Sequence, residues 1–254
     1  MCGIVGYTGF QDAYDIVING LRRLEYRGYD SAGIVLEDKN NSFEVKKTKG
    51  KVSDLVEISE NLKATSHVGM GHTRWATHGV PSDRNSHPHV SNDGKIALVH
   101  NGIIENYDTI KTMLIGKGFT FSSETDTEVL VNLIQYILDT QKINFSEAVR
   151  YALNEVYGAY AITVMHKDYP GVLVVGRLGS PLAIGLGDKE YFIASDASPF
   201  VEFTKEAVYL EDGHMATISL EKGVEIRSIK ENEIIEPSIQ ELKLSLEQIE
   251  KGGY

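Results

Sequence analysis

Cysteine is almost absent from this sequence: Cys2 is the only one among 254 residues. A disulfide within the chain is therefore excluded, and a chain of this length buries enough apolar surface to fold without one. No apolar run approaches about 18 residues, and residues 1–10 lack the basic start of a signal peptide, so neither a membrane helix nor secretion is indicated. We expect a soluble, cytoplasmic protein.

Positive charge is also scarce. There are 25 basic against 36 acidic side chains, which gives a net charge of −11. Surfaces that bind nucleic acid are normally basic, so this balance disfavours nucleic acid as a partner. Hydrophobic residues make up 42% of the chain, which is typical of a globular protein with a packed core.

The apolar patterns predict a run of strands, a helical middle and a second run of strands. Strands are expected at residues 2–7, 31–37, 43–48, 67–74, 95–101, 159–166, 172–177, 182–186, 191–195, 208–210, 215–220 and 224–229. Helices are expected from Ala13 to a stop at Gly28, at 52–62, around 110–116, at 126–138 and at 145–157. This order favours an α+β layered domain over the strict alternation of a doubly wound fold.

The chain is expected to form one domain over residues 1–236. Residues 237–254 begin with Pro237, end in two glycines and a tyrosine, and contain few apolar side chains. We interpret them as the start of a linker to further domains, and a naturally frayed terminus is the alternative.

The position of Cys2 suggests a nucleophile that carries its own base. Removal of Met1 would place the thiol beside a free α-amine. A thiol titrates near pH 8.5 and an α-amine near about 7.7–8.0, whereas a lysine amine titrates near 10.4. The α-amine is therefore a plausible general base at neutral pH. The alternative is a small, buried and inert side chain in a first strand.

Arg74 and Trp75 lie where an expected strand enters a long polar loop, residues 75–94. A loop of that length inside a compact domain is usually functional. An arginine fork suits a carboxylate, and a flanking tryptophan can close over a small ligand and exclude water. The alternative is a strand-end arginine next to a core tryptophan.

Two further segments could carry chemistry. Asn101-Gly102 ends an apolar strand, and an asparagine amide beside a glycine N–H can supply two donors to an oxyanion, although Asn-Gly is also a common tight turn. Residues 123–128 open a helix with three carboxylates; capping explains most of them, and one could pair with a ligand ammonium. Arg27 and Asp30 are interpreted as a local salt bridge on the residues alone.

Six of the eight histidines lie between residues 67 and 100, at positions 67, 72, 78, 87, 89 and 100. Zinc sites usually show a tight ligand pair such as HExxH or CxxC, and neither occurs here. Loop histidines that are solvated or hydrogen-bonded are therefore preferred over a metal site, and a histidine base for Cys2 is a second alternative. No cofactor motif is present, so no metal and no cofactor are expected.

Five ordered motifs carry a resemblance to a known family. They are Met-Cys-Gly-Ile-Val-Gly at residue 1, Tyr-Arg-Gly-Tyr-Asp-Ser-Ala-Gly at 26, Gly-His-Thr-Arg-Trp-Ala-Thr-His-Gly at 71, His-Asn-Gly at 100 and Ser-Glu-Thr-Asp-Thr-Glu at 123. In this order they resemble the class II glutamine amidotransferases, which are N-terminal-nucleophile hydrolases. The resemblance covers essentially the whole chain and implies a four-layer αββα sandwich.

The resemblance also implies roles for individual residues. Cys2 would attack the side-chain amide of L-glutamine, its freed α-amine would move protons, and Asn101 with the N–H of Gly102 would form the oxyanion hole. Arg74 would hold the α-carboxylate of glutamine, and Asp126 its α-ammonium. The other residues implied are Trp75, Thr77 and His78 on the loop that closes the pocket, and Arg27, which supports the nucleophile's end.

Two of the motifs, at Arg27 and at Arg74, are similar to those of members that deliver ammonia to fructose 6-phosphate. The full-length chains of such members continue into two sugar-isomerase domains, so those domains are the expected partners. The present chain alone is expected to be a glutaminase, monomeric or weakly dimeric, that makes no amino sugar. A catalytically silent glutamine-sensing module, and a glutaminase domain of another class II amidotransferase, are the alternatives.

Overall fold

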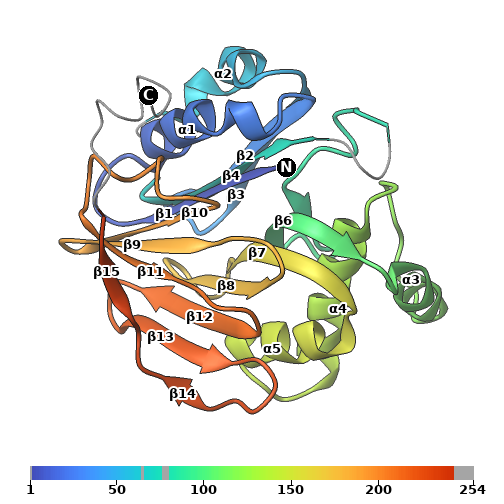
Figure 1. Ribbon diagram of the computed structural model, residues 1–254. Helices are drawn as coiled ribbons and strands as arrows, with labels where there is room; N and C mark the ends of the chain where they lie inside the picture. Colours follow the sequence, from blue (N-terminus) through green and yellow to red (C-terminus); the bar gives the residue numbers. More distant parts are fainter. Residues whose placement is uncertain (1, 64–65, 76–79, 243–254) are drawn as a thin grey trace.

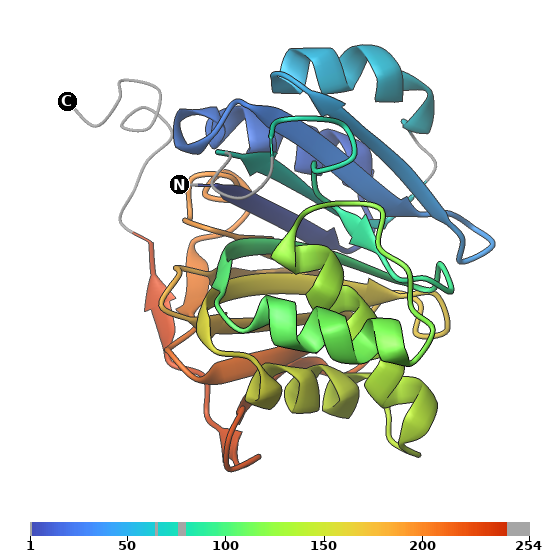
Figure 2. The same cartoon turned by 90° about the vertical axis from the view of Figure 1, so that its right-hand side faces the viewer.

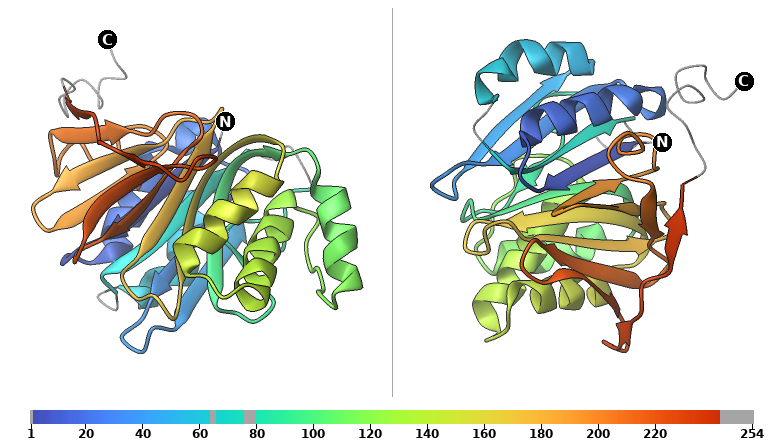
Figure 3. Two further views of the ribbon diagram at one scale, coloured as in Figure 1. Left: turned by 90° about the horizontal axis from the view of Figure 1, so that it is seen from below. Right: turned by 90° about the vertical axis from the view of Figure 1, so that its left-hand side faces the viewer.

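The computed structural model describes residues 2–63, 66–75 and 80–242. Two antiparallel sheets stack face to face, and helices cover both outer faces (Figure 1). Helices α1 and α2 contact the first sheet, whereas α4 and α5 contact the second and α3 lies against α4. Seen from the sides, the layers run helix, sheet, sheet, helix (Figure 2, Figure 3). The predicted αββα sandwich is therefore confirmed.

The first sheet has eight strands in the order β15-β11-β9-β10-β1-β4-β2-β3. Its central strands β1 and β4 pair antiparallel, with Gly3 opposite Thr73. The bounds are β1 Gly3–Thr8, β2 Ser31–Glu37, β3 Phe43–Lys49, β4 Val68–Arg74, β9 Ala183–Gly187, β10 Glu190–Ala194, β11 Glu206–Tyr209 and β15 Ile239–Glu241.

The second sheet has seven strands in the order β14-β13-β12-β8-β7-β6-β5. Its longest pairing joins β6 to β7 and places Asn101 opposite Ala161. The bounds are β5 His89–Val90, β6 Ile96–Ile104, β7 Gly158–His166, β8 Leu173–Leu178, β12 His214–Ser219, β13 Gly223–Ser228 and β14 Ile234–Ile235.

Helices α1, α4 and α5 begin at side chains that cap their first backbone N–H groups. Asp12 accepts from Tyr14 before α1 (Ala13–Arg23), Thr125 accepts from Glu128 at the start of α4 (Asp126–Thr140), and Asn144 accepts from Glu147 before α5 (Phe145–Glu155). The remaining helices are α2 Val52–Ser59 and α3 Tyr107–Gly116, with short 3₁₀ turns at Glu25–Arg27 and Glu60–Leu62. No described helix is long and apolar enough to cross a membrane.

The core between the sheets is built from alternate residues of the facing strands, because successive side chains of a strand point to opposite faces. Val68 and Met70 of β4 pack with Ala97 and Val99 of β6 in one buried cluster. The other face of β6 supplies residues such as Leu98 to the cluster under the helices. Apolar contacts thus join each layer to the next. Between the sheets, the inward-facing side chains of each strand form a row that runs along the strand to its end.

The expected helix stop at Gly28 is wrong. Helix α1 ends at Arg23, a 3₁₀ turn follows, and Gly28 is extended. A Cβ on Gly28 would lie 2.7 Å from the backbone C of Arg74 and the backbone N of Trp75, so the glycine permits a close approach of two chain segments.

The sequence patterns also missed β5, β14 and β15. Strand β15 pairs with β11 at the edge of the first sheet, so residues 239–241 join the fold although they lie after the expected boundary at 236. Residues 243–254 lie outside the described residues, and the linker stays a prediction.

Candidate active site

At one end of the interface between the sheets, the inward-facing residues of the strands change from apolar to polar. The inward row of β4 runs Val68, Met70, His72, Arg74, and the first two of these belong to the core. By the same alternation Asn101 continues the row of Ala97 and Val99. Cys2 extends the row of Ile4 in the same way. The fold therefore brings residues from three distant parts of the sequence to one end of the sheet interface.

A small cavity of about 20 Å³ lies at this end. Its walls include five residues that the sequence assigned to a site and four polar neighbours. They are Cys2, Arg74, Trp75, Gly102 and Asp126, together with His87, His100, Thr125 and Thr127. A cavity of this volume holds about one water molecule.

The thiol of Cys2 is held by the backbone at the end of β4. The N–H of Trp75 donates to the sulfur at 3.2 Å, and the thiol can donate to the carbonyl O of Trp75 at 3.5 Å. Burial raises the pKa of the Cys2 thiol, and the Trp75 backbone and the charge of Arg74 oppose that rise only in part. The thiol is therefore largely protonated at neutral pH and needs a base before it can act as a nucleophile.

Opposite charges stand on two walls of the cavity. Arg74 ends β4 and is 4% exposed, and Asp126 begins α4 and is 6% exposed. Burial lowers the pKa of the Arg74 guanidinium, whereas the negative charges near it, Asp126 among them, raise it. An Oδ2 atom of Asp126 accepts from the backbone N–H of Ile104 at 2.8 Å, which fixes the carboxylate. A ligand with both a carboxylate and an ammonium could bridge this pair.

Asn101 and Gly102 lie within β6, which continues to Ile104, so the strand end expected at Asn101 and the tight-turn alternative are both wrong. The amide Nδ2 of Asn101 donates to the backbone O of Cys2 at 3.0 Å. Gly102 has φ +135°, and a Cβ there would lie 2.0 Å from the carbonyl O of Ala159. Only glycine fits this conformation and this spacing, so the sequence at 102 is dictated by the backbone.

Arg27 does not reach the cavity walls. Its Nε donates to Asp196 Oδ2 at 2.9 Å and to the hydroxyl of Tyr26 at 3.1 Å. The acid that pairs with Arg27 is therefore Asp196, distant in sequence, and not the neighbouring Asp30 that the residues alone suggested. The role of Arg27 in supporting the nucleophile's end stays a prediction.

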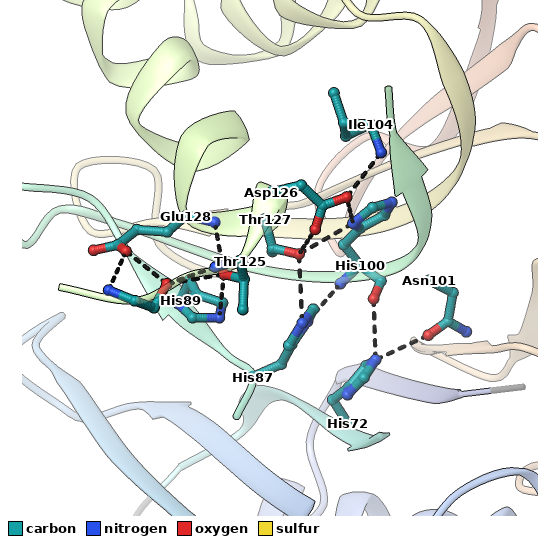
Figure 4. A network of polar contacts seen from close by, with 11 residues as sticks. His72, His87, His89, His100, Asn101, Ile104, Thr125, Asp126, Thr127 and Glu128 are labelled. Carbon is teal, nitrogen blue, oxygen red and sulfur yellow. Dashed lines mark hydrogen bonds and ion pairs between the residues drawn. The ribbon is translucent and has the colours of Figure 1, made fainter. Parts of the chain in front are cut away.

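Four buried histidines, His72, His87, His89 and His100, lie close together, and His87 and His100 line the cavity (Figure 4). The rings of His72 and His87 stack with centroids 4.2 Å apart, and His89 lies edge-on to His87 at 5.0 Å. The fourth, His100, reaches Thr127 Oγ1 with its Nδ1 at 3.1 Å. Burial lowers the pKa of all four, to about 3 for His72, so they are neutral near pH 7.

These four histidines are hydrogen-bonded, as the preferred interpretation expected, but all four are buried rather than solvated. Among the described residues, no group of three or more His, Cys, Asp or Glu side chains is arranged to hold a metal ion. Thr77 and His78 lie outside the described residues. Trp75 is 45% exposed, which contradicts the alternative of a core tryptophan.

Besides the four polar neighbours in the cavity walls, two residues that contact the site were not assigned to it from the sequence. His72 contacts Asn101, and Ser195, which follows β10, accepts from both Asn101 and the backbone N–H of Ile4. The signal that could have found them is strand alternation. His72 continues the inward row of β4, and Ser195 continues the row of Ile193.

Two stacked sheets between helical layers, with a thiol at residue 2 facing a buried arginine and aspartate, define a class II amidotransferase of the N-terminal-nucleophile type. Comparison with known proteins agrees with this class and gives the family. The chain belongs to the family of glutamine amidotransferase domains, which matches residues 40–244.

Curated relatives include the glutamine–fructose-6-phosphate aminotransferases [isomerizing] of Bacteroides thetaiotaomicron and Chlorobaculum tepidum. Each is 51% identical, over 254 and 258 aligned residues, and each alignment covers 100% of this chain and 41% of the relative. The chain therefore spans about two-fifths of the length of these relatives.

Solved structures agree with the fold. A glutamine phosphoribosylpyrophosphate amidotransferase from B. subtilis, complexed with ADP and GMP, has a TM-score of 0.76 and 29% identity, covering 91% of this chain and 50% of that one. A glutamine aminotransferase class-II domain protein from Silicibacter pomeroyi has a TM-score of 0.58 and 15% identity, covering 89% of this chain and 99% of that one. The second likeness concerns the fold alone.

Proposed function

We propose that this chain hydrolyses the side-chain amide of L-glutamine through Cys2, and that the longer protein to which it corresponds transfers the ammonia to fructose 6-phosphate. The observation that carries the proposal is one cavity that Cys2, Arg74 and Asp126 line together. Glutamine has an α-carboxylate, an α-ammonium and an amide, and these three groups match the guanidinium, the carboxylate and the thiol.

The reaction begins with removal of Met1, which exposes the α-amine of Cys2. That amine takes the thiol proton, the sulfur attacks the amide carbon, and the amide nitrogen leaves as ammonia after it receives the proton. The product on the enzyme is a glutamyl thioester. Water then attacks the same carbon, which releases glutamate and returns the proton to the thiol.

The negative charge that develops on the carbonyl oxygen needs donors. Asn101 Nδ2 and the N–H of Gly102 are proposed to supply them, because Asn101 is already bonded to the backbone of Cys2 and Gly102 lines the cavity. Trp75 is proposed to shield the bound glutamine from water, with Thr77 and His78 as further contacts. Arg27 is proposed to act indirectly, by anchoring Asp196 beside Ser195.

The acceptor of the ammonia is inferred from the names of the relatives, glutamine–fructose-6-phosphate aminotransferases. This chain corresponds to 41% of their length, so sugar-isomerase domains in the remainder would bind fructose 6-phosphate. The chain alone is proposed to release ammonia to solvent and to make no glucosamine 6-phosphate. We propose a cytoplasmic protein whose isolated glutaminase domain is a monomer or weak dimer, which sedimentation at several concentrations would test.

The test uses the chain with Met1 removed, verified by intact mass. Glutamate release from glutamine should be measured for this protein, for the same protein with Met1 retained and for Cys2→Ala. We expect turnover only in the first, with at least about a 1,000-fold loss in the other two, because each lacks either the base or the nucleophile.

A glutamine analogue with an alkylating group in place of the amide gives an independent readout. It should add one mass equivalent to the Met1-free protein and none to Cys2→Ala. Saturable glutamine binding without glutamate release would support a sensing module instead, and release of ammonia from a different amide would support another amidohydrolase. Amino-sugar formation by this chain from fructose 6-phosphate would contradict the division of labour proposed here.

A further inference from the structure

We propose that His72 is a positioning residue for the reaction: it fixes the orientation of the Asn101 amide so that Nδ2, and not Oδ1, faces the nucleophile. This inference rests on the proposed function, because it assigns a task to the presumed oxyanion donor. It concerns a buried side chain that no step of the proposed mechanism uses. Nε2 of His72 reaches two hydrogen-bond acceptors, the backbone O of His100 and Asn101 Oδ1 (Figure 4).

The position of the proton on His72 follows from its neighbours. Its Nε2 lies 3.1 Å from the backbone O of His100 and 2.9 Å from Asn101 Oδ1. A backbone carbonyl only accepts, so Nε2 must carry the hydrogen. The Asn101 atom that faces the same N–H must then be the amide oxygen, since an NH₂ group there would oppose another donor.

The other end of the Asn101 amide gives the same orientation. Its second atom lies 3.0 Å from the backbone O of Cys2 and 3.0 Å from Ser195 Oγ. The Cys2 carbonyl only accepts, so this atom must be Nδ2. A rotated amide would place two donors together at His72 and two acceptors together at Cys2. The two carbonyls, of His100 and Cys2, thus determine the arrangement from opposite sides.

His72 is itself held in one state. Its side chain is buried, at 1% exposure, and its ring is stacked on that of His87. Burial lowers the pKa of His72 to about 3, so the ring stays neutral and keeps the single Nε2 hydrogen throughout the range in which enzymes usually work. A permanent donor fixed in place is what a rigid support for a catalytic amide requires.

Loss of the His72 donor should affect the transition state more than substrate binding. Removal of one oxyanion donor typically lowers kcat by about 100- to 1,000-fold. A wrongly oriented Asn101 amide would lose part of this stabilisation of the oxyanion. We therefore expect kcat to fall by about 30- to 100-fold in His72→Leu. The KM for glutamine should change little, because Arg74 and Asp126 are untouched.

The test compares two substitutions at His72 in the Met1-free chain. In His72→Gln the side-chain amide can still donate from a position near Nε2, whereas His72→Leu has similar bulk and no donor. We expect the glutamine variant to retain kcat within about fivefold and the leucine variant to show the larger loss. Each variant is also made with Asn101→Ala, which gives a double-mutant cycle in kcat.

If His72 acts through Asn101, the leucine substitution should cost less than about threefold once Asn101 is alanine. His89→Leu is the matched control, because His89 is also buried in this cluster but bonds Thr125 at 3.0 Å rather than Asn101. The fold-change that His89→Leu causes in kcat should be the same with and without Asn101→Ala, as expected for independent sites. Circular dichroism and the unfolding midpoint of each variant show whether a loss of kcat follows a loss of fold.

Equal activities of the leucine and glutamine variants, or effects of His72→Leu and Asn101→Ala that simply multiply, would overturn the inference. The proposed function fails separately. It is refuted if the Met1-free wild-type chain releases no glutamate, or if Cys2→Ala releases it at the wild-type rate.

Discussion

Two hollows in this molecule differ in volume and in how deeply the charged residues that line them are buried. The larger, about 650 Å³, is a groove beside the start of α5; the smaller, about 20 Å³, contains Cys2. Residues that line the groove include Phe145, Tyr169, Leu220, Glu225 and Arg227. Judged by volume alone, the groove would be the candidate site.

The chemistry of the walls points the other way. In the groove, Arg227 pairs with Glu225 at 2.8 Å, and both side chains are substantially exposed. Such surface pairs contribute little to stability or selectivity. At the cavity, Arg74 and Asp126 are almost fully buried. Burial strengthens the attraction of these two charges for the opposite charges of a zwitterionic ligand.

The two hollows also lie at opposite ends of the second sheet. Asn101 pairs with Ala161 on β7, whereas the groove is lined by the turn that follows the last residue of β7, His166. Five residues of strand separate the two positions, which corresponds to roughly 17 Å. Substitutions in one hollow should therefore leave the other unchanged.

The largest difference in kcat/KM between the two hollows is expected when an arginine in each, Arg74 or Arg227, is replaced by lysine. Arg74→Lys loses the planar fork that holds a carboxylate through two hydrogen bonds, and such bonds to a charged group are worth about 1.5–3 kcal/mol. We expect kcat/KM for glutamine to fall roughly 100-fold, mainly through KM. Arg227→Lys is the matched control and should stay within twofold of wild type. A fall in kcat at unchanged KM would show that Arg74 does not serve substrate binding.

The second prediction concerns pH and the buried histidines. An unfolded histidine has a pKa near about 6.5, whereas folded His72 has a pKa of about 3. Between these values the unfolded chain binds a proton that the folded chain does not, so the unfolding free energy should fall as pH falls below about 6.5 and be flat with respect to this group above it.

Urea unfolding at several pH values measures this effect. Between pH 5 and 6 the slope of the unfolding free energy against pH should be smaller in His72→Gln than in wild type, by about 1 kcal/mol per pH unit. The burial-lowered pKa values of His87, His89 and His100 add to the wild-type slope in the same direction. Identical slopes in the two proteins would mean that His72 is protonated in the folded state.

Much of the fold could be predicted from the sequence because its strands and helices carry strong periodic patterns. The expected strand at 43–48 is Phe43–Lys49, and the expected helix at 126–138 is Asp126–Thr140. Strands β5 and β14 have two residues each, too few to show an alternating pattern. The helix stop expected at Gly28 is wrong because position 28 needs a glycine for another reason. The backbone of Arg74 and Trp75, distant in sequence, passes too close to leave room for a side chain.

The candidate site divides in the same way. Cys2, Arg74 and Gly102 could be proposed because their chemistry is visible in local motifs. The support behind them could not, since the contact between His72 and Asn101 depends on two sheets facing each other at one register. A histidine that is useful for one fixed hydrogen bond leaves no spacing pattern, unlike a metal ligand pair.

The smallest effect is expected from Arg227→Ala in the groove. This change removes the pair with Glu225 and a hydrogen bond to the carbonyl O of Asn232 at 3.1 Å. Because the pair is exposed to water, the unfolding free energy should fall by no more than about 1 kcal/mol, and kcat/KM for glutamine should stay within twofold. Steady-state kinetics and urea unfolding measure both. A tenfold loss of activity without a loss of stability would couple the groove to the cavity, and the separation between the two hollows would then have to be abandoned.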